Sequence, residues 1–483
     1  MFCCACIFSN QAHALVLPWL EDPLNSEERV AGFGKKSKPA SCPPPPDTEQ
    51  ILKINEVVIA VICHNTQARS AYWTLLNSSD SYSSQVLAAY LPSISATLSR
   101  SKRTLFTESG KSSSISTSTS LDRASVTLYD LGQRELTLES AELGLIASGH
   151  SYDSTLQGFI SDALQAYYGL LIAQNNIEIV KESLEFSQQS TEAARLRYEL
   201  GLVPLADKLQ SEVSLSQSKL ALEQAEIALV QLQAALALLM GMSPDHRIIV
   251  AELDDSQLME DPFTARVRSL MKYAKQERVD LKAARLGLKA SEVGYEALKR
   301  ENLLSVSVTA TSGYDDIDVL NNSTTRGSTI GVNVTIPIFT AWQQTYNERT
   351  ARRSLKAQRE ALKDTERNIE QNVWNAWHAY KTAKTSWEIS WDQLGVATQL
   401  RDVSLGRYKE GLGTILDVLS AQNQYSSALQ THLQTRLDLL TARIDLISAV
   451  GVLNLDSMQT NVMIPVDESE ETNTTQPQEP DNS

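Results

Sequence analysis

The sequence lacks the residue patterns that carry most enzyme chemistry. It contains no phosphate-binding loop, no G-x-G-x-x-G, no H-E-x-x-H and no nucleophile elbow. Asp207 and Asp417 could form a catalytic pair, but the six histidines are scattered and no metal cluster accompanies these acids. The formal charge of −15 disfavours nucleic acid as a partner. We therefore expect neither an enzyme nor a cofactor-binding protein.

Long apolar runs and phenylalanine are also scarce. No stretch of 18 consecutive apolar residues exists, which predicts no transmembrane helix, so a membrane role would need a β-barrel. Only 8 Phe occur, whereas Gln, Ser, Ala and Leu abound, as is typical of long helices. The composition therefore argues against the ordinary globular domains that 483 residues would otherwise suggest.

The N-terminus has the pattern of a short export signal. Residues 1–14 combine an apolar run with a small-residue cleavage site that ends at Ala14. The basic residues that usually begin such a signal are missing, so a non-native N-terminus stays open as the alternative. Residues 15–50, with four consecutive prolines, are predicted to be a linker.

Cysteine usage depends on this signal, because removal of residues 1–14 leaves only Cys42 and Cys63. Two cysteines in an exported chain predict one disulfide, with two free thiols as the alternative. No second pair of Cys or His residues has the spacing of a zinc site.

An internal repeat organises the rest of the chain. The stretch 407–451 reproduces the design of 197–241, 210 residues earlier, with Arg, Tyr, Gly, Leu, Asp and a terminal Gly at matching positions. Each copy places a glycine-containing turn before a helix of about 30 residues. The turn glycines are Gly201, Gly411 and Gly413.

Both repeated helices carry apolar seams at heptad spacing. One seam of the first copy comprises Leu222, Ala225, Leu229, Leu232, Leu236 and Leu239. A second seam comprises Ile227, Val230, Ala234 and Ala237, and the later copy repeats it as Leu433, Leu437, Leu440, Ile444 and Ile447. Two seams let one helix contact a neighbour on each side, which suits a sheet or barrel of helices. An ordinary long coiled coil is the alternative.

Four segments change to a period of two, with apolar residues alternating with Ser or Thr, and these segments predict two β-hairpins. The predicted strands are 91–99, 112–128, 303–312 and 329–339. The lipid-facing residues of the first strand are expected to be Ile94, Ala96 and Leu98. Four strands cannot close a barrel in one chain, since the smallest barrels have about 8, so they must combine between subunits or pack as soluble edges.

The expected fold is α+β and mostly α. A helical pattern runs from residue 51 to about 89, and residues 133–200 and 342–410 contain no proline, so each could be a helix of about 100 Å. Pairing each long helix with the shorter one after it gives a long helical hairpin. The expected domains are a first repeat at 51–241, an equatorial region at 242–275, a second repeat at 276–455 and a disordered acidic tail at 456–483.

These features resemble the TolC family of outer-membrane channel-tunnels of Gram-negative bacteria, over about residues 51–455. The resemblance rests on the two strand hairpins, the two helical hairpins and the duplicated R-Y-x-x-G-x-x-x-x-x-D turn. The segment 62–69 resembles the family's A-L-x-N-P-Q-x-R motif, with Thr66 where proline is usual, and the segments 90–93 and 128–132 resemble the family's strand boundaries.

The resemblance implies a homotrimer with a 12-stranded barrel in outer-membrane lipid and a periplasmic helical tunnel. Such a protein is a passive exit duct that works with a periplasmic adaptor and an inner-membrane ABC or other transporter. Cys42 and Cys63 further resemble the branch that serves type I secretion of toxins. The alternatives are the same duct in small-molecule efflux and a structural periplasmic coiled-coil protein.

The resemblance also implies a gate beside the helical turns. The motif places Tyr408 opposite Asp207 and makes Asp417 the first acid of a ring around the axis. Gly413 stands where the family has a linking Arg, and Ser420 where it has the second ring acid, so we expect a less tightly latched tunnel. The alternative is that both aspartates only cap or solvate helix starts.

Overall fold

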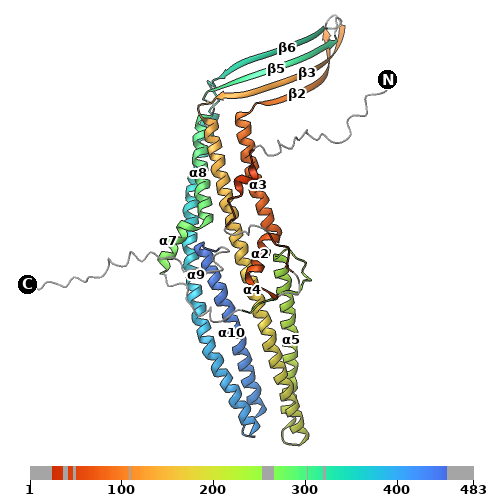
Figure 1. Cartoon of the computed structure of the whole chain (residues 1–483), viewed down its shortest axis with the longest axis vertical. Coiled ribbons are helices and arrows are strands. Elements are labelled where there is room, and N and C mark those ends of the chain that lie inside the picture. Colours follow the sequence, from red (N-terminus) through yellow and green to blue (C-terminus); the bar gives the residue numbers. More distant parts are fainter. Residues whose placement is uncertain are drawn as a thin grey trace, which may run out of the picture. The chain divides into compact units, whose positions relative to one another are not determined.

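The computed structural model describes residues 24–35, 42–46, 51–107, 110–252, 266–301, 303–318 and 323–453. The predicted signal and the predicted acidic tail lie outside these ranges. The chain divides into two compact units. Unit 1 comprises residues 1–33, 73–149 and 283–361, and unit 2 comprises residues 34–72, 150–282 and 362–483. Figure 1 shows the elements in sequence colours.

Unit 1 contains a four-stranded antiparallel sheet in the order β2-β3-β5-β6 (Figure 1). The strands are β2 (Ser93–Thr107), β3 (Gly110–Tyr129), β5 (Ser305–Asp318) and β6 (Ser323–Thr335). The first hairpin runs past the alternating sequence, because the pairing of β2 with β3 continues to Thr107 and Gly110. The sheet is open, and β2 and β6 are its edges.

A short N-terminal helix, α1 (Ser26–Val30), packs on α3 (Thr66–Tyr90) in unit 1. The hydroxyl of Ser26 donates to Asp80 at 2.5 Å, and Ser79 donates to the Ser26 carbonyl at 2.8 Å. Val30 is buried. This part of the predicted linker 15–50 is therefore packed structure, because one apolar side chain and two hydroxyl contacts seat it on α3.

The two longest helices match the predicted spans. They are α4 (Gln133–Glu199) and α9 (Gln343–Lys409), each of 67 residues and 210 residues apart in the sequence. The same turn precedes both. Leu131 and Gly132 have positive φ before α4, and Ala341 and Trp342 have positive φ before α9. A non-glycine residue in this left-handed conformation costs about 1–3 kcal/mol. Trp342 bears this cost, whereas glycine, as Gly132, fills the matching position of the first repeat.

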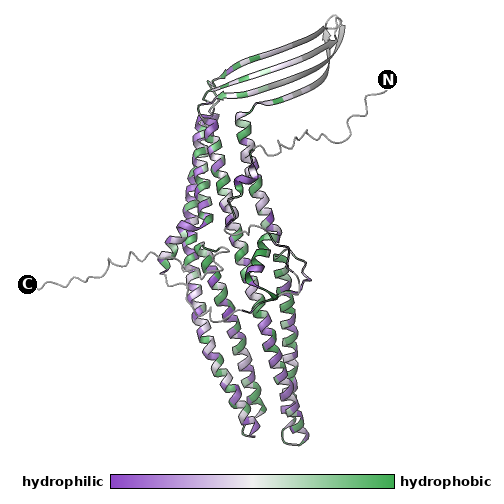
Figure 2. Ribbon diagram, in the orientation of Figure 1, coloured by the Kyte–Doolittle hydropathy of each residue, from purple (hydrophilic) through white to green (hydrophobic). Residues whose placement is uncertain are grey.

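In unit 2 the predicted first helix is broken. Strand β1 (Ile51–Leu52) pairs in parallel with β4 (Ile249–Val250), and α2 (Ile54–His64) ends before Asn65. The Asn65 side-chain oxygen accepts from the backbone N–H groups of Gln67 and Ala68, at 2.8 and 3.1 Å, and so caps α3. The apolar periodicity continues across this cap, which is why it predicted one helix. Figure 2 shows how strongly hydrophobic α2 is.

The structure joins Cys42 to Cys63 by a disulfide, with the two Cα atoms 5.6 Å apart. The neighbouring His64 ring nitrogen lies 2.9 Å from the Pro43 carbonyl oxygen. The bond ties the segment 42–46 to the buried helix α2. The strand directly before α2, β1, pairs with β4 in the middle of the chain.

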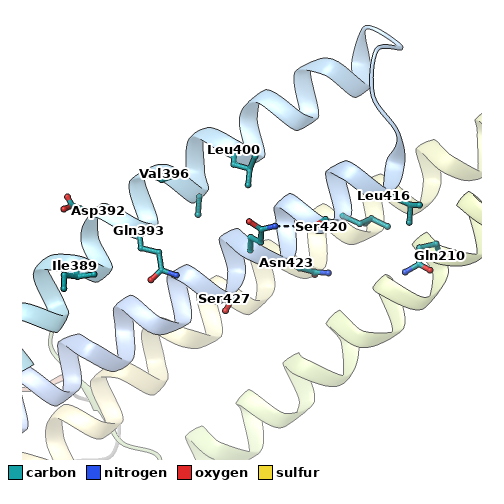
Figure 3. A pocket seen from close by; sticks show the side chains of 13 residues that line it. Gln210, Ile389, Asp392, Gln393, Val396, Leu400, Leu416, Ser420, Asn423 and Ser427 are labelled. Carbon is teal, nitrogen blue, oxygen red and sulfur yellow. Dashed lines mark hydrogen bonds between the residues drawn. The ribbon is translucent and has the colours of Figure 1, made fainter.

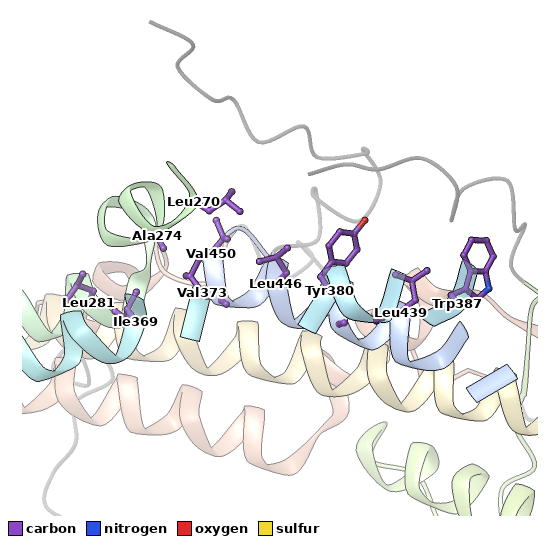
Figure 4. Packing of buried hydrophobic residues seen from close by; sticks show 13 residues of the cluster. Leu270, Ala274, Leu281, Ile369, Val373, Tyr380, Trp387, Leu439, Leu446 and Val450 are labelled. Atoms are coloured by element: carbon purple, nitrogen blue, oxygen red, sulfur yellow. The ribbon is translucent and has the colours of Figure 1, made fainter. Parts of the chain in front are cut away.

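The helices that follow the glycine turns are α5 (Leu205–Leu239) and α10 (Ile415–Val450). The α10 helix packs on α9 through a cluster that also includes α7 (Val267–Glu277) and the start of α8 (Val279–Arg300), as Figure 4 shows. Its members include Leu270, Leu281, Ile369, Val373, Tyr380, Trp387, Leu439 and Leu446.

The apolar seams of α5 and α10 differ in burial. In α10 the second seam is buried or half-buried, with Leu433, Leu440 and Ile444 all under 9% exposed. In α5 the first seam contacts α4 around Ala225, whereas Ile227 and Val230 of the second are 58% and 60% exposed. Among the described residues, α5 is also the one helix long and apolar enough to cross a membrane. We assign its apolar residues to helix packing, because they follow heptad spacing.

Candidate functional site: the glycine turns and the α9–α10 groove

Both helical hairpins turn through the same backbone motif. The N–H groups of Gly201 and Leu202 donate to the carbonyls of Tyr198 and Arg197, and Gly411 and Leu412 repeat these bonds 210 residues later. Gly201 and Gly411 have φ of 70° and 74°. The turn needs this left-handed conformation, which glycine adopts without a Cβ penalty.

Asp417 closes a capping box at the start of α10. Its carboxylate accepts from the Thr414 backbone N–H at 3.0 Å, and the Thr414 hydroxyl accepts from the Asp417 N–H at 3.2 Å. The bond from the Thr414 N–H, more than any other contact, lowers the pKa of Asp417 below its ordinary value. The carboxyl is fully exposed and stays charged at neutral pH. It therefore both caps the helix and presents charge to solvent.

Asp207 occupies the matching place in α5 but caps nothing. Pro204 stands where the second repeat has Thr414, and proline has neither an N–H nor a hydroxyl to complete the box. Within the described residues, no hydrogen bond or ion pair is found for the Asp207 side chain. Only one of the two aspartates is thus a helix cap.

Tyr408 lies in a small apolar cluster with Ile415, Val418 and Leu419, against Phe186 of α4. Its hydroxyl is buried and has no hydrogen-bond partner in the described part of the chain. The structure does not join Tyr408 to Asp207. Instead the guanidinium of Arg197 lies 4.1 Å from the Tyr408 ring centroid.

This Arg197 contact was not predicted from sequence. Arg197 was visible only as a repeated turn residue, since its match is Arg407. A contact between residues about 210 apart depends on how the hairpins pack, which the local pattern does not encode. Space for a side chain exists at Gly413, where an added Cβ would lie 3.4 Å from the nearest atom, the Tyr408 nitrogen. Packing therefore does not require a glycine at this position.

Ser420 lines a groove between α9 and α10, close to the turn (Figure 3). The groove encloses about 900 Å³. Its apolar wall comprises Ile389, Val396, Ala397, Leu400, Leu416 and Leu419, and its polar residues include Gln393, Asn423, Gln424 and Ser427. The hydroxyl of Ser420 lies 3.5 Å from Gln424. A mainly apolar groove with amide and hydroxyl groups suits a helix better than an ion.

The described residues contain no group of three or more His, Cys, Asp or Glu that could hold a metal ion. Among the described residues, the turn region thus offers the exposed capping carboxylate of Asp417, the buried Tyr408 and a helix-lined groove.

These elements define an outer-membrane channel: two repeats, each with a strand hairpin and a long helical hairpin. The chain belongs to the outer membrane efflux protein family, whose model matches residues 62–242 and 270–452. It is a mostly helical channel component of tripartite systems, located in the outer membrane with its helical part in the periplasm. Family members of this kind are channels rather than enzymes.

Individual relatives agree with this assignment. The chain is 26% identical to "Protein CyaE" of Bordetella pertussis over 419 residues, covering 85% of this chain and 86% of the relative. It is 24% identical to "Outer membrane protein TolC" of Vibrio cholerae, covering 68% and 76%. The solved CmeC outer membrane channel of Campylobacter jejuni has the same fold, with a TM-score of 0.70, 18% identity, and coverage of 86% and 90%.

Proposed function

We propose that the chain forms the homotrimeric exit duct of a type I protein-secretion system that exports a toxin. The observation that carries the trimer is the open sheet, whose β2 and β6 edges expose unpaired backbone groups. Lipid does not tolerate unpaired backbone, so the edges must pair between chains. Three chains supply twelve strands, and the exposed α5 seam supplies a matching helix contact.

Type I secretion is favoured over small-molecule efflux by the long match to the CyaE protein and by the Cys42–Cys63 pair. Other relatives are named as efflux proteins, which keeps small-molecule efflux as the alternative. The duct itself is passive. A periplasmic adaptor docks a helical hairpin in the α9–α10 groove and links the duct to an inner-membrane ABC transporter.

Deletion of the gene separates the two functions. The proposal expects a large protein to disappear from the culture medium and to return with the parent gene, while sensitivity to dyes and antibiotics is unchanged throughout. The reverse pattern, with normal secretion and increased drug sensitivity, contradicts type I secretion and supports efflux. Loss of both indicates a shared duct.

The gate residues follow from the same assembly. Three Asp417 carboxylates near one threefold axis repel each other and attract cations. Tyr408 and Asp207 both have unused hydrogen-bonding capacity in the single chain, so they are available to each other when the hairpins shift. Such a bond would contribute about 0.5–3 kcal/mol per subunit to the closed state.

Single-channel conductance in planar bilayers tests the gate. Tyr408→Phe combined with Asp207→Ala should raise the closed-state conductance, and Asp417→Ala should weaken cation selectivity and block by divalent cations. Parent-like conductance in both variants rejects the gate assignment but not the trimer.

A further inference from the structure

The two repeats differ where the sheet of unit 1 meets its helices. In the first repeat the turn Asp130-Leu131-Gly132-Gln133 leads from β3 into α4. In the second, Thr340-Ala341-Trp342-Gln343 leads into α9. Both turns make the same bonds, since Gln133 and Gln343 donate to the carbonyls of Asp130 and Thr340. The backbone is thus conserved between the repeats, and only the side chains have changed.

Trp342 is strained and exposed at this turn. Its φ is 65°, the conformation that Gly132 adopts in the first repeat at 77°. Its side chain is 67% exposed, so no packing inside the chain accounts for an indole at a position that favours glycine. A contact from outside the chain would offset this strain.

The residues before Trp342 are also apolar and exposed. Ile336, Ile338 and Phe339 are 62%, 97% and 76% exposed. They lie between the end of β6, which is part of the membrane sheet, and the first turn of α9. Such a run, followed by an aromatic residue, has the chemistry of a lipid–water boundary, where Trp and Tyr gather.

Cations follow on the same face of α9. Trp342, Tyr346, Arg349 and Arg353 are spaced by four, three and four residues, which aligns them on one side of the helix. The Arg349 guanidinium lies 5.5 Å from the centroid of the exposed Tyr346 ring. Helical side chains lean towards the N-terminus, so both arginines reach towards the strand end.

The corresponding face of the first repeat has the opposite character. Gly132, Leu136, Glu139 and Leu143 stand at the positions of Trp342, Tyr346, Arg349 and Arg353. Glu139 is exposed like Arg349, so the charge is reversed at matched sites. Within the described residues, Arg353 has no ion pair, in a chain whose net charge is −15.

We propose that Trp342, Tyr346, Arg349 and Arg353 form a binding site for a phospholipid with an anionic headgroup. The apolar segment 336–339 and the indole lie among acyl chains and glycerol, and the two guanidiniums contact the phosphates. Favourable partitioning of the indole offsets the strain of its backbone. The site exists once per chain, in the second repeat, and does not depend on the exported cargo.

The test is native mass spectrometry of the purified full-length channel, titrated with phosphatidylglycerol or phosphatidylcholine. The first-repeat mimic Trp342→Gly/Arg349→Glu/Arg353→Leu should bind phosphatidylglycerol at least about 30-fold more weakly, since each basic residue near an anionic headgroup contributes roughly fivefold. The control Lys181→Glu/Lys219→Leu has the same charge change on exposed residues of α4 and α5 and should bind like the parent. Equal binding of both lipids to the parent, or parent-like binding by the mimic, overturns the proposal.

A second measurement covers a mimic that does not assemble. In the single variant Trp342→Phe, quenching of tryptophan fluorescence by brominated lipids should fall relative to the parent. In Trp342→Gly the detergent-solubilised channel should melt at a higher temperature, because glycine relieves the positive φ. Unchanged quenching together with a lower melting temperature shows that the indole packs within the protein and rejects the lipid site.

Discussion

At the scale of single residues, the repeat offers an internal comparison for each aspartate. Asp417 completes a capping box with Thr414, whereas Asp207 faces Pro204 and caps nothing. The same acid at the same turn therefore has two physical states, set by the residue three positions earlier. The alternative to a gate was that both aspartates only cap or solvate helix starts, and of the two only Asp417 is a cap.

Because the pKa of Asp417 is lowered, the stability of the first turn of α10 depends on pH. Because the folded pKa lies below the unfolded one, near 4, the stabilisation is complete above about pH 4 and is lost as pH falls through the folded pKa. Hydrogen exchange at residues 415–419 should be faster in Asp417→Ala than in the parent at pH 6, after correction for intrinsic rates. The difference should shrink as pH falls through the folded pKa of Asp417. A difference that is undiminished below that pKa contradicts the role of the ionised carboxylate.

The missing cap of α5 can be installed. Pro204→Thr recreates the box that Thr414 and Asp417 form, and should raise the free energy of unfolding by about 0.5–2 kcal/mol, measured by denaturant titration. Pro204→Ala, which restores the N–H without the hydroxyl, is the control and should gain less. If Asp207 is the partner of Tyr408 in the closed channel, Pro204→Thr should also raise closed-state conductance by engaging its carboxylate.

At the scale of elements, sequence periodicity predicted most of the fold. The 67-residue helices begin and end within one or two residues of the predicted spans, because uninterrupted helical pattern and glycine turns are local signals. The break at Asn65 and the packing of α1 were missed. Both depend on tertiary partners: Asn65 also donates to the Leu239 carbonyl, and α1 is held by Ser79 and Asp80 of α3.

The contacts around the proposed gate residues were predicted less completely, for the same reason. Tyr408, Asp207 and Asp417 could be located by their repeated turn motif. The Arg197 contact arises from the packing of one hairpin on another, and the groove that Ser420 lines arises from the packing of α10 on α9. No spacing along the chain specifies these contacts.

The Cys42–Cys63 bond anchors the N-terminal segment to α2. Mass mapping of the mature protein under non-reducing conditions should recover one peptide pair linked through these residues. Cys42→Ser should lower stability by roughly 3 kcal/mol in the chain-entropy model, since the bond spans 21 residues. Two free thiols in the mature protein, or a Cys42→Ser variant as stable as the parent under oxidising conditions, argue against the bond.

The edge strand β2 has an assignable lipid face. Ile94 is 69% exposed in the single chain and is expected to face lipid. Ile94→Arg should reduce the stability of the folded barrel by about 2–4 kcal/mol if it lies at mid-bilayer, as measured by urea-dependent folding into vesicles. Ser95→Arg on the opposite face is the control and should cost less. Normal assembly of Ile94→Arg with failure of Ser95→Arg means that the two faces are reversed.

At the scale of the whole molecule, the single chain forms its strand and helix hairpins but leaves sheet edges unpaired and an apolar helix surface exposed. The sheet has two free edges, and α5 carries an apolar stripe that recurs every seven residues at Val213, Leu220 and Ile227, each 50–59% exposed. The corresponding residues of α10 are Asn423 and Gln430, which are polar and exposed, and Leu437, which is half-buried. A closed ring of copies would pair the free edges of the sheet and cover the exposed apolar stripe of α5 at the same time.

If copies of the chain contact each other through the α5 stripe, a charged variant of this stripe should fold but not form trimers. Leu220→Lys/Ile227→Lys adds two charges to a stripe that is exposed in the chain but desolvated in the trimer. The helical circular dichroism should be unchanged, and light scattering should report monomers instead of trimers. Glu226→Lys on the charged flank of α5 makes the same total change in charge and should leave the trimer intact. Leu236→Ala, at a fully buried position, should instead destabilise the chain itself by about 2–5 kcal/mol. Trimers of normal stability in Leu220→Lys/Ile227→Lys would place the contact between copies elsewhere, on the sheet edges alone.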